Sequence, residues 1–144
     1  MIKSKYLADA LAELIDKPKF VIIDGEFKWL DERDMPDEKL ILEKIKEYEV
    51  KEKRRQIEDI ASQKVRKILK EYDYDDRGDV AIWATKGILE KNPFYDEAVA
   101  IQKWIKQMDI KMYELQDRIN VKNVDSINID ELTKEFPEFE GVAS

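Results

Sequence analysis

The chain has 144 residues, 41% of them charged, a net charge of −7 and neither cysteine nor histidine. Without those two side chains it has no disulfide, thiol nucleophile, Cys- or His-ligated metal or imidazole base. Its negative field would repel nucleic acid. We therefore expect a structural or interaction protein rather than an enzyme, with no cofactor, metal site, small-molecule substrate or nucleic-acid partner.

No apolar run approaches the roughly 18 residues that a membrane-spanning helix requires, so we expect no membrane association. Asp9 and Glu13 interrupt the apolar pattern near the N-terminus, unlike the core of a signal peptide. The negative charge lies mainly at the other end. Residues 125–144 hold six acids against Lys134 alone, which accounts for −5 of the net charge and leaves the rest of the chain nearly neutral.

Apolar residues at helical spacing predict an amphipathic helix over residues 4–15, with Ser4 as its cap. Two β-rich runs, 20–23 and 26–30, then flank Asp24-Gly25. A two-residue Asp-Gly loop favours a type I′ turn, because glycine tolerates the positive φ that this turn requires. The sequence therefore predicts a helix followed by a β-hairpin.

An isolated two-stranded hairpin is marginally stable in water, so it must pack on a helix or pair with another chain. Packing on the preceding helix is the favoured alternative, and the strand edges are candidate docking edges. The hairpin residues that we expect to contact a partner are Phe20, Ile22, Phe27 and Trp29.

A long helix is predicted from about residue 36 to 72, since no proline or glycine interrupts it and Asp34-Met35-Pro36 forms a helix start capped by Asp34. Its apolar positions fall into two groups, separated by the polar segment 49–56. A helix that is polar all round has no neighbour to pack on, or bridges two packed regions. We interpret 49–56 as an exposed connector and candidate hinge, in which Lys53-Arg54-Arg55 forms a solvated, ion-paired face rather than a phosphate site.

The C-terminal half predicts a helical bundle. Helices over 57–72, 79–89 and 94–119 would pack antiparallel around one core. In the last helix, apolar residues recur at alternating steps of four and three, as in a coiled-coil seam; they are Phe94, Ala98, Ile101, Ile105, Met108, Met112, Leu115 and Ile119. The pattern leaves open whether this seam closes within one chain or between chains. As candidate partner contacts along it we name Ile101, Ile105, Met108 and Met112.

Two shorter segments complete the pattern. Residues 72–79 resemble the start of a calcium loop, but a loop counted from Asp73 has Arg77 and Ala84 where oxygen ligands are needed. An acidic turn with Asp79 as the cap of the next helix is therefore favoured. Residues 128–139 predict a short capped helix and an aromatic tail, for which folding back on the bundle is favoured over docking on a partner.

These elements predict a mainly α fold. A small N-terminal helix and β-hairpin form one module, over residues 1–35. A charged helical connector, 36–56, joins it to a three-helix bundle with an acidic tail, 57–144.

Over residues 57–139 several short motifs follow one another in a fixed order. They are Tyr74-Asp75, Ala81 and Ala84, Asn92-Pro93-Phe94, Glu97-Ala98, Trp104, Glu131-Leu132 and Phe136-Pro137. In their order and spacing they resemble a family of small bacteriophage proteins encoded near tail-fibre and tail genes. The resemblance covers more than half of the chain and carries no catalytic residues.

The resemblance implies a tail- or virion-associated protein, made in the cytoplasm of the bacterial host. With the helical pattern, it predicts a non-enzymatic structural or adaptor component that contacts other virion or tail proteins and can form a homo-oligomer. The alternative is a phage assembly chaperone or regulatory binding protein that is not retained in the virion, with an acidic segment, 125–140, that mimics or shields a basic surface.

Overall fold

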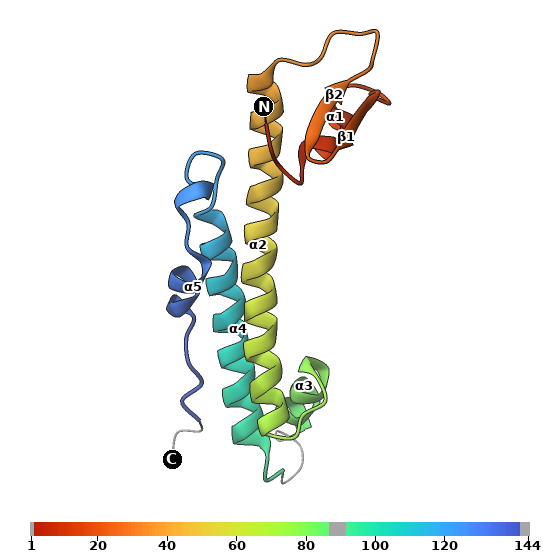
Figure 1. Ribbon diagram of the computed structural model, residues 1–144. Coiled ribbons are helices and arrows are strands. Elements are labelled where there is room, and N and C mark those ends of the chain that lie inside the picture. Colours follow the sequence, from red (N-terminus) through yellow and green to blue (C-terminus); the bar gives the residue numbers. More distant parts are fainter. Residues whose placement is uncertain (1, 87–91, 142–144) are drawn as a thin grey trace. The chain divides into compact units, whose positions relative to one another are not determined.

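The computed structural model describes residues 2–86 and 92–141 (Figure 1). It is mainly helical, with a small N-terminal helix and a two-stranded antiparallel hairpin, which confirms the predicted fold class. The elements in chain order are α1 (Leu7–Leu14), β1 (Phe20–Ile23), β2 (Glu26–Trp29), α2 (Glu38–Glu71), α3 (Arg77–Lys86), α4 (Tyr95–Asp117), the 3₁₀ turn η1 (Val124–Ser126), α5 (Ile129–Leu132) and the 3₁₀ turn η2 (Thr133–Glu135). Within the described ranges, no helix is both long and apolar enough to cross a bilayer.

The chain forms two compact units. Unit 1 comprises Met1–Glu52 and Asn120–Asp125, and unit 2 comprises Lys53–Ile119 and Ser126–Ser144. The boundary between them falls inside α2, within the segment 49–56. The finer division into 1–35, 36–56 and 57–144 stays a prediction.

The hydrophobic core of unit 1 forms between α1 and the first turns of α2. Its buried residues are Leu7, Ala10 and Leu11 of α1 and Ile41 and Ile45 of α2. The spacing of three and four in α1 places its three residues on one face. Phe20, Phe27 and Trp29 of the hairpin pack against this core. The favoured alternative for the hairpin, packing on its own preceding helix, is therefore confirmed.

The hairpin has the turn that its sequence predicts. Asp24 and Gly25 both have positive φ, 51° and 81°, as a type I′ turn requires. The two strands pair in register from Ile23 with Glu26 at the turn to Phe20 with Trp29 at the open end. The backbone twist of a type I′ turn matches the right-handed twist of the two strands, so two residues suffice to connect them.

α1 begins three residues after the serine predicted as its cap. Ser4 forms a turn before the helix: its Oγ accepts the Tyr6 N–H at 3.1 Å, and its carbonyl accepts the Leu7 N–H at 3.2 Å. The N-cap position is Tyr6, so the prediction of Ser4 as the cap was wrong.

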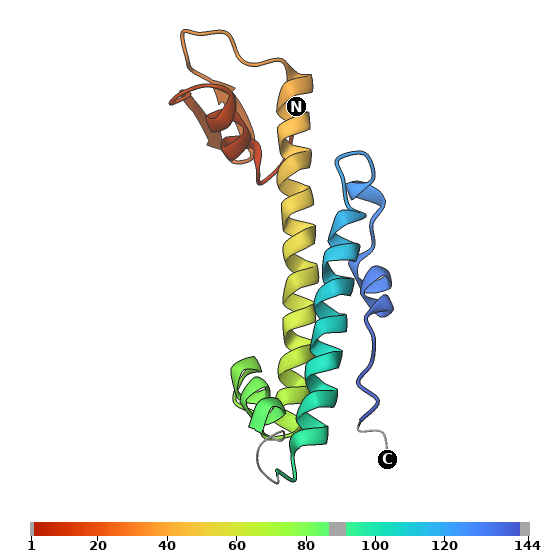
Figure 2. The ribbon, with the colours of Figure 1, turned by 180° about the vertical axis from the view of Figure 1, so that it is seen from behind.

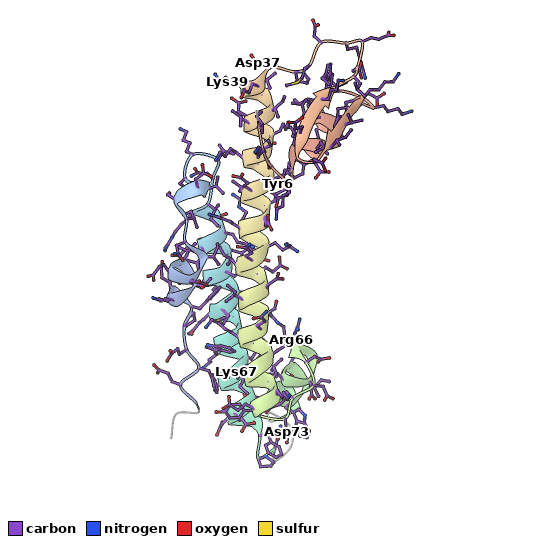
Figure 3. All side chains as sticks on the ribbon, in the orientation of Figure 1. Tyr6, Asp37, Lys39, Arg66, Lys67 and Asp73 are labelled. Carbon is purple, nitrogen blue, oxygen red and sulfur yellow. The ribbon has the colours of Figure 1, made fainter. Side chains whose placement is uncertain are left out.

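α2 also begins later than predicted, at Glu38. Asp37 Oδ1 accepts the Lys39 N–H at 3.1 Å, so Asp37 caps this helix and the prediction of Asp34 was wrong (Figure 3). The physical reason lies in Pro36, because the residue before a proline, here Met35, is disfavoured in helical conformation. The helix therefore begins only beyond the proline.

α2 ends in a Schellman motif that turns the chain towards α3. The Tyr74 N–H donates to the Leu69 carbonyl at 2.8 Å, and the Asp73 N–H donates to the Lys70 carbonyl at 3.3 Å. Asp73 takes the left-handed conformation, φ 64°, that usually selects glycine. Figure 3 labels this residue at the end of α2. Leu69 and Tyr74 are both buried, as the accompanying apolar contact of this motif requires.

The core of unit 2 is shared by α2, α3 and α4. α2 and α4 lie side by side and antiparallel in both views (Figures 1 and 2). The buried residues are Ile57, Ala61, Val65 and Leu69 of α2, Val80 and Ala84 of α3, and Ala98, Ile101, Trp104, Ile105, Met108 and Leu115 of α4. Six of the eight predicted seam residues are thus buried within one chain, whereas Met112 is half-buried and Phe94, just before α4, is 50% exposed. The predicted helix 79–89 corresponds to α3, and residues 87–89 of that prediction lie outside the described residues.

The C-terminal tail folds back on unit 2, as favoured from the sequence. Trp104 Nε1 donates to the Pro137 carbonyl at 2.9 Å. The Phe139 ring meets Tyr72 and Trp104 edge-on, with centroids 5.4 and 5.7 Å apart. Phe136 is buried beside this tail segment.

The polar segment 49–56 is helical and only partly exposed. Arg54 donates from Nη2 to the Ile119 carbonyl at 2.8 Å and from Nε to the Gln116 carbonyl at 3.1 Å. Gln116 lies in the last turn of α4 and Ile119 two residues beyond the end of that helix, where the helix dipole favours a cation. The Gln116 carbonyl also accepts the Ile119 N–H at 3.1 Å. Val50 is buried as well. The predicted exposed connector is therefore exposed at Lys51, Arg54, Arg55 and Gln56, and it is half-buried or buried at its other four positions.

We expect Ile105→Asp to destabilise unit 2 by about 3 kcal/mol or more, because the new carboxylate has no partner in an apolar core. Ile105 is 7% exposed, whereas Ile110 on the same helix is 60% exposed. The matched variant Ile110→Asp should change the free energy of unfolding by no more than about 0.5 kcal/mol. Urea unfolding followed by circular dichroism measures both, and equal effects of the two variants would contradict the observed packing of α4.

Asp73→Gly should stabilise unit 2 by about 0.5–1 kcal/mol, because glycine adopts the left-handed conformation without the steric cost that a side chain carries. The change also removes a negative charge near the C-terminal end of α2, where the helix dipole disfavours it. The control is Asp75→Gly, a position without positive φ, which should not raise the melting temperature. A lower melting temperature for Asp73→Gly would refute this account of the turn.

Candidate partner-binding surface

The two faces of the hairpin differ in burial. The register places Phe20, Ile22, Phe27 and Trp29 on one face, and Val21, Ile23, Glu26 and Lys28 on the other. Three aromatic residues of the first face pack on the core of unit 1. At the turn end of β1, Ile22 remains 50% exposed and Ile23 65% exposed. The apolar surface that the hairpin presents to solvent is therefore concentrated on β1.

The outer edges of both strands are unpaired within the described residues. The Leu30 N–H donates to the Lys19 carbonyl at 2.9 Å, which marks this pair as hydrogen-bonded. Since hydrogen-bonded and non-hydrogen-bonded pairs alternate in an antiparallel ladder, the backbone groups of Phe20 and Ile22 point away from β2. The described sheet has two strands, so nothing in it pairs with them.

The two edges differ in charge. β2 carries Glu26 and Lys28, and charged side chains of this kind protect an edge strand from pairing with another chain. β1 has the residues Phe20, Val21, Ile22 and Ile23, without a charge. The edge of β1 is therefore the one that an extended segment of another protein can join.

A bidentate ion pair fixes the open end of the hairpin. Arg33 donates from Nε and Nη2 to the two carboxylate oxygens of Asp31 at 2.9 and 2.8 Å, and from Nη2 to the Asp16 carbonyl at 2.8 Å. Asp31 Oδ2 also accepts the Lys19 N–H at 3.0 Å. The hydrogen bonds from Arg33 hold the pKa of the Asp31 carboxyl well below its usual range. Asp31 and Arg33 thereby join the end of α1 to both strands.

A second polar cluster joins α1 to α2. Tyr48 donates its hydroxyl to Glu13 Oε1 at 2.8 Å, and its ring stacks on Tyr6 with centroids 5.5 Å apart. The hydrogen bond to Glu13, with burial and the charge of that carboxylate, raises the pKa of Tyr48 to about 12. The same bond, together with Lys44, lowers the pKa of Glu13. The hydrogen bond between Tyr48 and Glu13 therefore serves the packing of α1 on α2, because each side chain fixes the position of the other.

Of the eight contact residues predicted from the sequence, only Ile22 has an exposed side chain, at 50%. Phe20, Phe27 and Trp29 are half-buried on the core of unit 1. Ile101, Ile105 and Met108 are buried in unit 2 beside half-buried Met112, so packing within the chain occupies this seam. Sequence reasoning missed Ile23, although strict alternation places its side chain on the outer face.

The acidic turn after α2 uses its carboxylates internally. Asp76 Oδ1 accepts the Asp79 N–H at 2.8 Å, and Asp79 Oδ2 accepts the Asp75 N–H at 3.1 Å. Because α3 begins at Arg77, Asp76 is the capping residue, and the prediction of Asp79 as the cap was wrong. Among residues 2–86 and 92–141, no group of three or more acids has the geometry to hold a metal ion.

Several residues of the motifs from which a phage resemblance is predicted make contacts within unit 2. Buried Tyr74 donates its hydroxyl to Glu97 Oε1 at 3.0 Å, and burial together with this bond raises its pKa to about 12. Asn92 Nδ2 donates to the Trp83 carbonyl at 2.9 Å. Trp104 binds the Pro137 carbonyl as described above, and Ala98 is fully buried. In this chain these motifs therefore lie at turns, at a close contact between helices and at the docked tail.

Unit 1 should lose less stability on acidification in the variant Asp31→Asn than in the wild type. The Asp31 pKa is depressed in the folded state, so the unfolded chain takes up the proton first, near the ordinary value of 3.8. Its contribution is complete above that pH and is lost as the pH falls below it. Melting temperatures from pH 7 to pH 2.5 should fall less steeply in the variant. Glu32→Gln, an exposed neighbour, is the control, and equal slopes for wild type and Asp31→Asn would exclude this role.

Comparisons with models of protein families, with curated proteins and with solved structures give no match to this chain.

Proposed function

We propose that this protein is a non-enzymatic structural or adaptor component of a bacteriophage particle, associated with its tail or virion. In this role it binds another particle protein by adding a strand of that protein to the edge of β1. The observation that carries the proposal is the unpaired, charge-free edge of β1 beside the exposed side chains of Ile22 and Ile23.

Two further observations support a binding role. The polar side chains described above are engaged in hydrogen bonds and ion pairs that join one element to another, so their chemistry is directed to packing. The resemblance over residues 57–139 supports placement in a phage particle, and its residues in unit 2 serve the fold. A chain that combines a helical unit with a hairpin whose edge is open suits an adaptor.

The alternative is an assembly chaperone or regulatory protein that leaves before the particle is complete. It would use the acidic segment 125–140 to shield a basic surface. Three of the six acids in this segment, Asp125, Glu131 and Glu135, form ion pairs with Lys46, Lys134 and Arg118. These pairs reduce the charge left for a partner, which favours the adaptor.

Mass spectrometry of purified particles separates the two functions. We expect the chain in a fixed stoichiometric ratio to the major tail or capsid proteins of the phage that encodes it. Its presence in infected cells but absence from the particles would refute the structural role and favour the chaperone.

Ile22→Pro should abolish incorporation of the chain into particles. Proline lacks the N–H that Ile22 directs outward at the edge of β1, and this N–H takes no part in the pairing with β2. Ile22→Thr keeps both the N–H and the β-branched shape, so it should be incorporated like the wild type. Circular dichroism melts verify that both variants are folded, and normal incorporation of folded Ile22→Pro would show that β1 is not the attachment edge.

A further inference from the structure

Unit 1 contains an open groove that the hairpin does not form. It lies along the first turns of α2 beside Val121 and has a volume of about 700 Å³. Its lining residues are Asp37, Glu38, Lys39, Leu42, Glu43, Lys46, Glu47 and Val121. Figures 1 and 2 show the hairpin and the 120–125 segment on opposite sides of α2, and Figure 3 shows Asp37 and Lys39 at its first turn.

The floor of the groove is apolar and exposed. Leu42 is 42% exposed and Val121 47% exposed. Ile41 and Ile45 face the core that α2 forms with α1. Because successive residues of a helix are rotated by 100°, the side chain of Leu42 points out of that core. Val121 comes from a segment about 80 positions later in the chain, so two distant parts of the sequence form this floor. An apolar centre within a charged rim is the anatomy of a protein-binding site.

The rim is acidic, with four carboxylates against two lysines. Lys46 is engaged by Asp125 and Glu49, and the hydrogen bond to Asp125 is the main cause of its raised pKa. Glu47 pairs with Lys44 at 3.2 Å. Glu38 and Glu43 form no ion pair within the described residues, so the rim has carboxylates available to a cationic partner.

We propose that this groove binds a basic amphipathic helix of a partner protein. An apolar side chain of that helix would fill the space between Leu42 and Val121, and its lysines or arginines would face Glu38 and Glu43. The groove extends along ten residues of α2, about 15 Å, which matches three turns of a docked helix. The acidic rim would repel nucleic acid and the anionic lipids of a membrane surface.

The inference rests on the proposed function only in requiring a protein partner. Because the groove and the edge of β1 lie on different sides of α2 within unit 1, one chain can bind a strand at β1 and a helix in the groove at the same time. Two separate surfaces on one small unit are what an adaptor between two proteins needs.

The test uses the full-length chain and a fluorescein-labelled 14-residue peptide, with leucines at helical spacing i, i+3, i+4 and i+7 and lysines elsewhere. Fluorescence anisotropy should show binding that weakens as salt is raised from 50 to 500 mM. Glu38→Lys/Glu43→Lys should raise the Kd about tenfold, since each reversal replaces an attraction by a repulsion. Leu42→Ser should weaken binding without lowering the melting temperature.

The matched control is Glu26→Lys/Glu32→Lys, which makes the same charge change at exposed acids of unit 1 outside the groove. The proposal would be overturned if this control weakened peptide binding as much as Glu38→Lys/Glu43→Lys does. It would also be overturned if a peptide with glutamates in place of lysines bound equally well, or if the lysine peptide did not bind. Binding of a fluorescein-labelled DNA duplex to the chain in the absence of the peptide, weakened by Leu42→Ser, would overturn it too. Ile22→Pro should bind the peptide like the wild type, so failure of the groove and failure of the β1 edge are separately visible.

Discussion

Both hydrophobic cores depend on the burial of apolar residues from one helix, α2. Ile41 and Ile45 complete the core that α1 and the hairpin need, because neither a two-turn helix nor a two-stranded hairpin buries enough apolar surface alone. Further along, Ile57, Ala61, Val65 and Leu69 supply the α2 side of the core with α3 and α4. The 34 residues of α2 therefore serve two units through two separate apolar groups.

Polar residues in this protein are used to satisfy backbone groups at the ends of elements. Arg54 occupies carbonyls at the end of α4, Arg33 binds carbonyls after α1, and Asp37 and Asp76 cap α2 and α3. A buried backbone group without a hydrogen-bond partner destabilises the fold. In a chain with many charged residues, some of their side chains can serve as these partners. Arg33 and Arg54 in this way join one element to another, whereas Asp37 and Asp76 each stabilise the start of a single helix.

Two surfaces of unit 1 take no part in the packing of the described part of the chain, and they are consistent with a protein that connects two others. The edge of β1 offers unpaired backbone groups and exposed aliphatic side chains, which suit an extended segment. The groove beside Leu42 offers an apolar floor and carboxylates, which suit a basic helix. The different chemistry of the two sites would let one unit discriminate between two partners, since an extended apolar strand and a cationic helix fit different surfaces.

Elements whose signal is local could be predicted from the sequence. Alternating steps of four and three predicted the buried face of α4, and Asp24-Gly25 predicted the turn of the hairpin, because helical periodicity and positive φ are properties of the backbone over a few residues. The sequence could not decide between neighbouring acids as caps, since Asp34 and Asp37, or Asp76 and Asp79, have the same chemistry. Tertiary structure alone decided the role of Arg54, the burial of the seam within one chain and the meeting of Leu42 with Val121. Each of these depends on residues far apart in the sequence that only the packed chain brings within reach of one another.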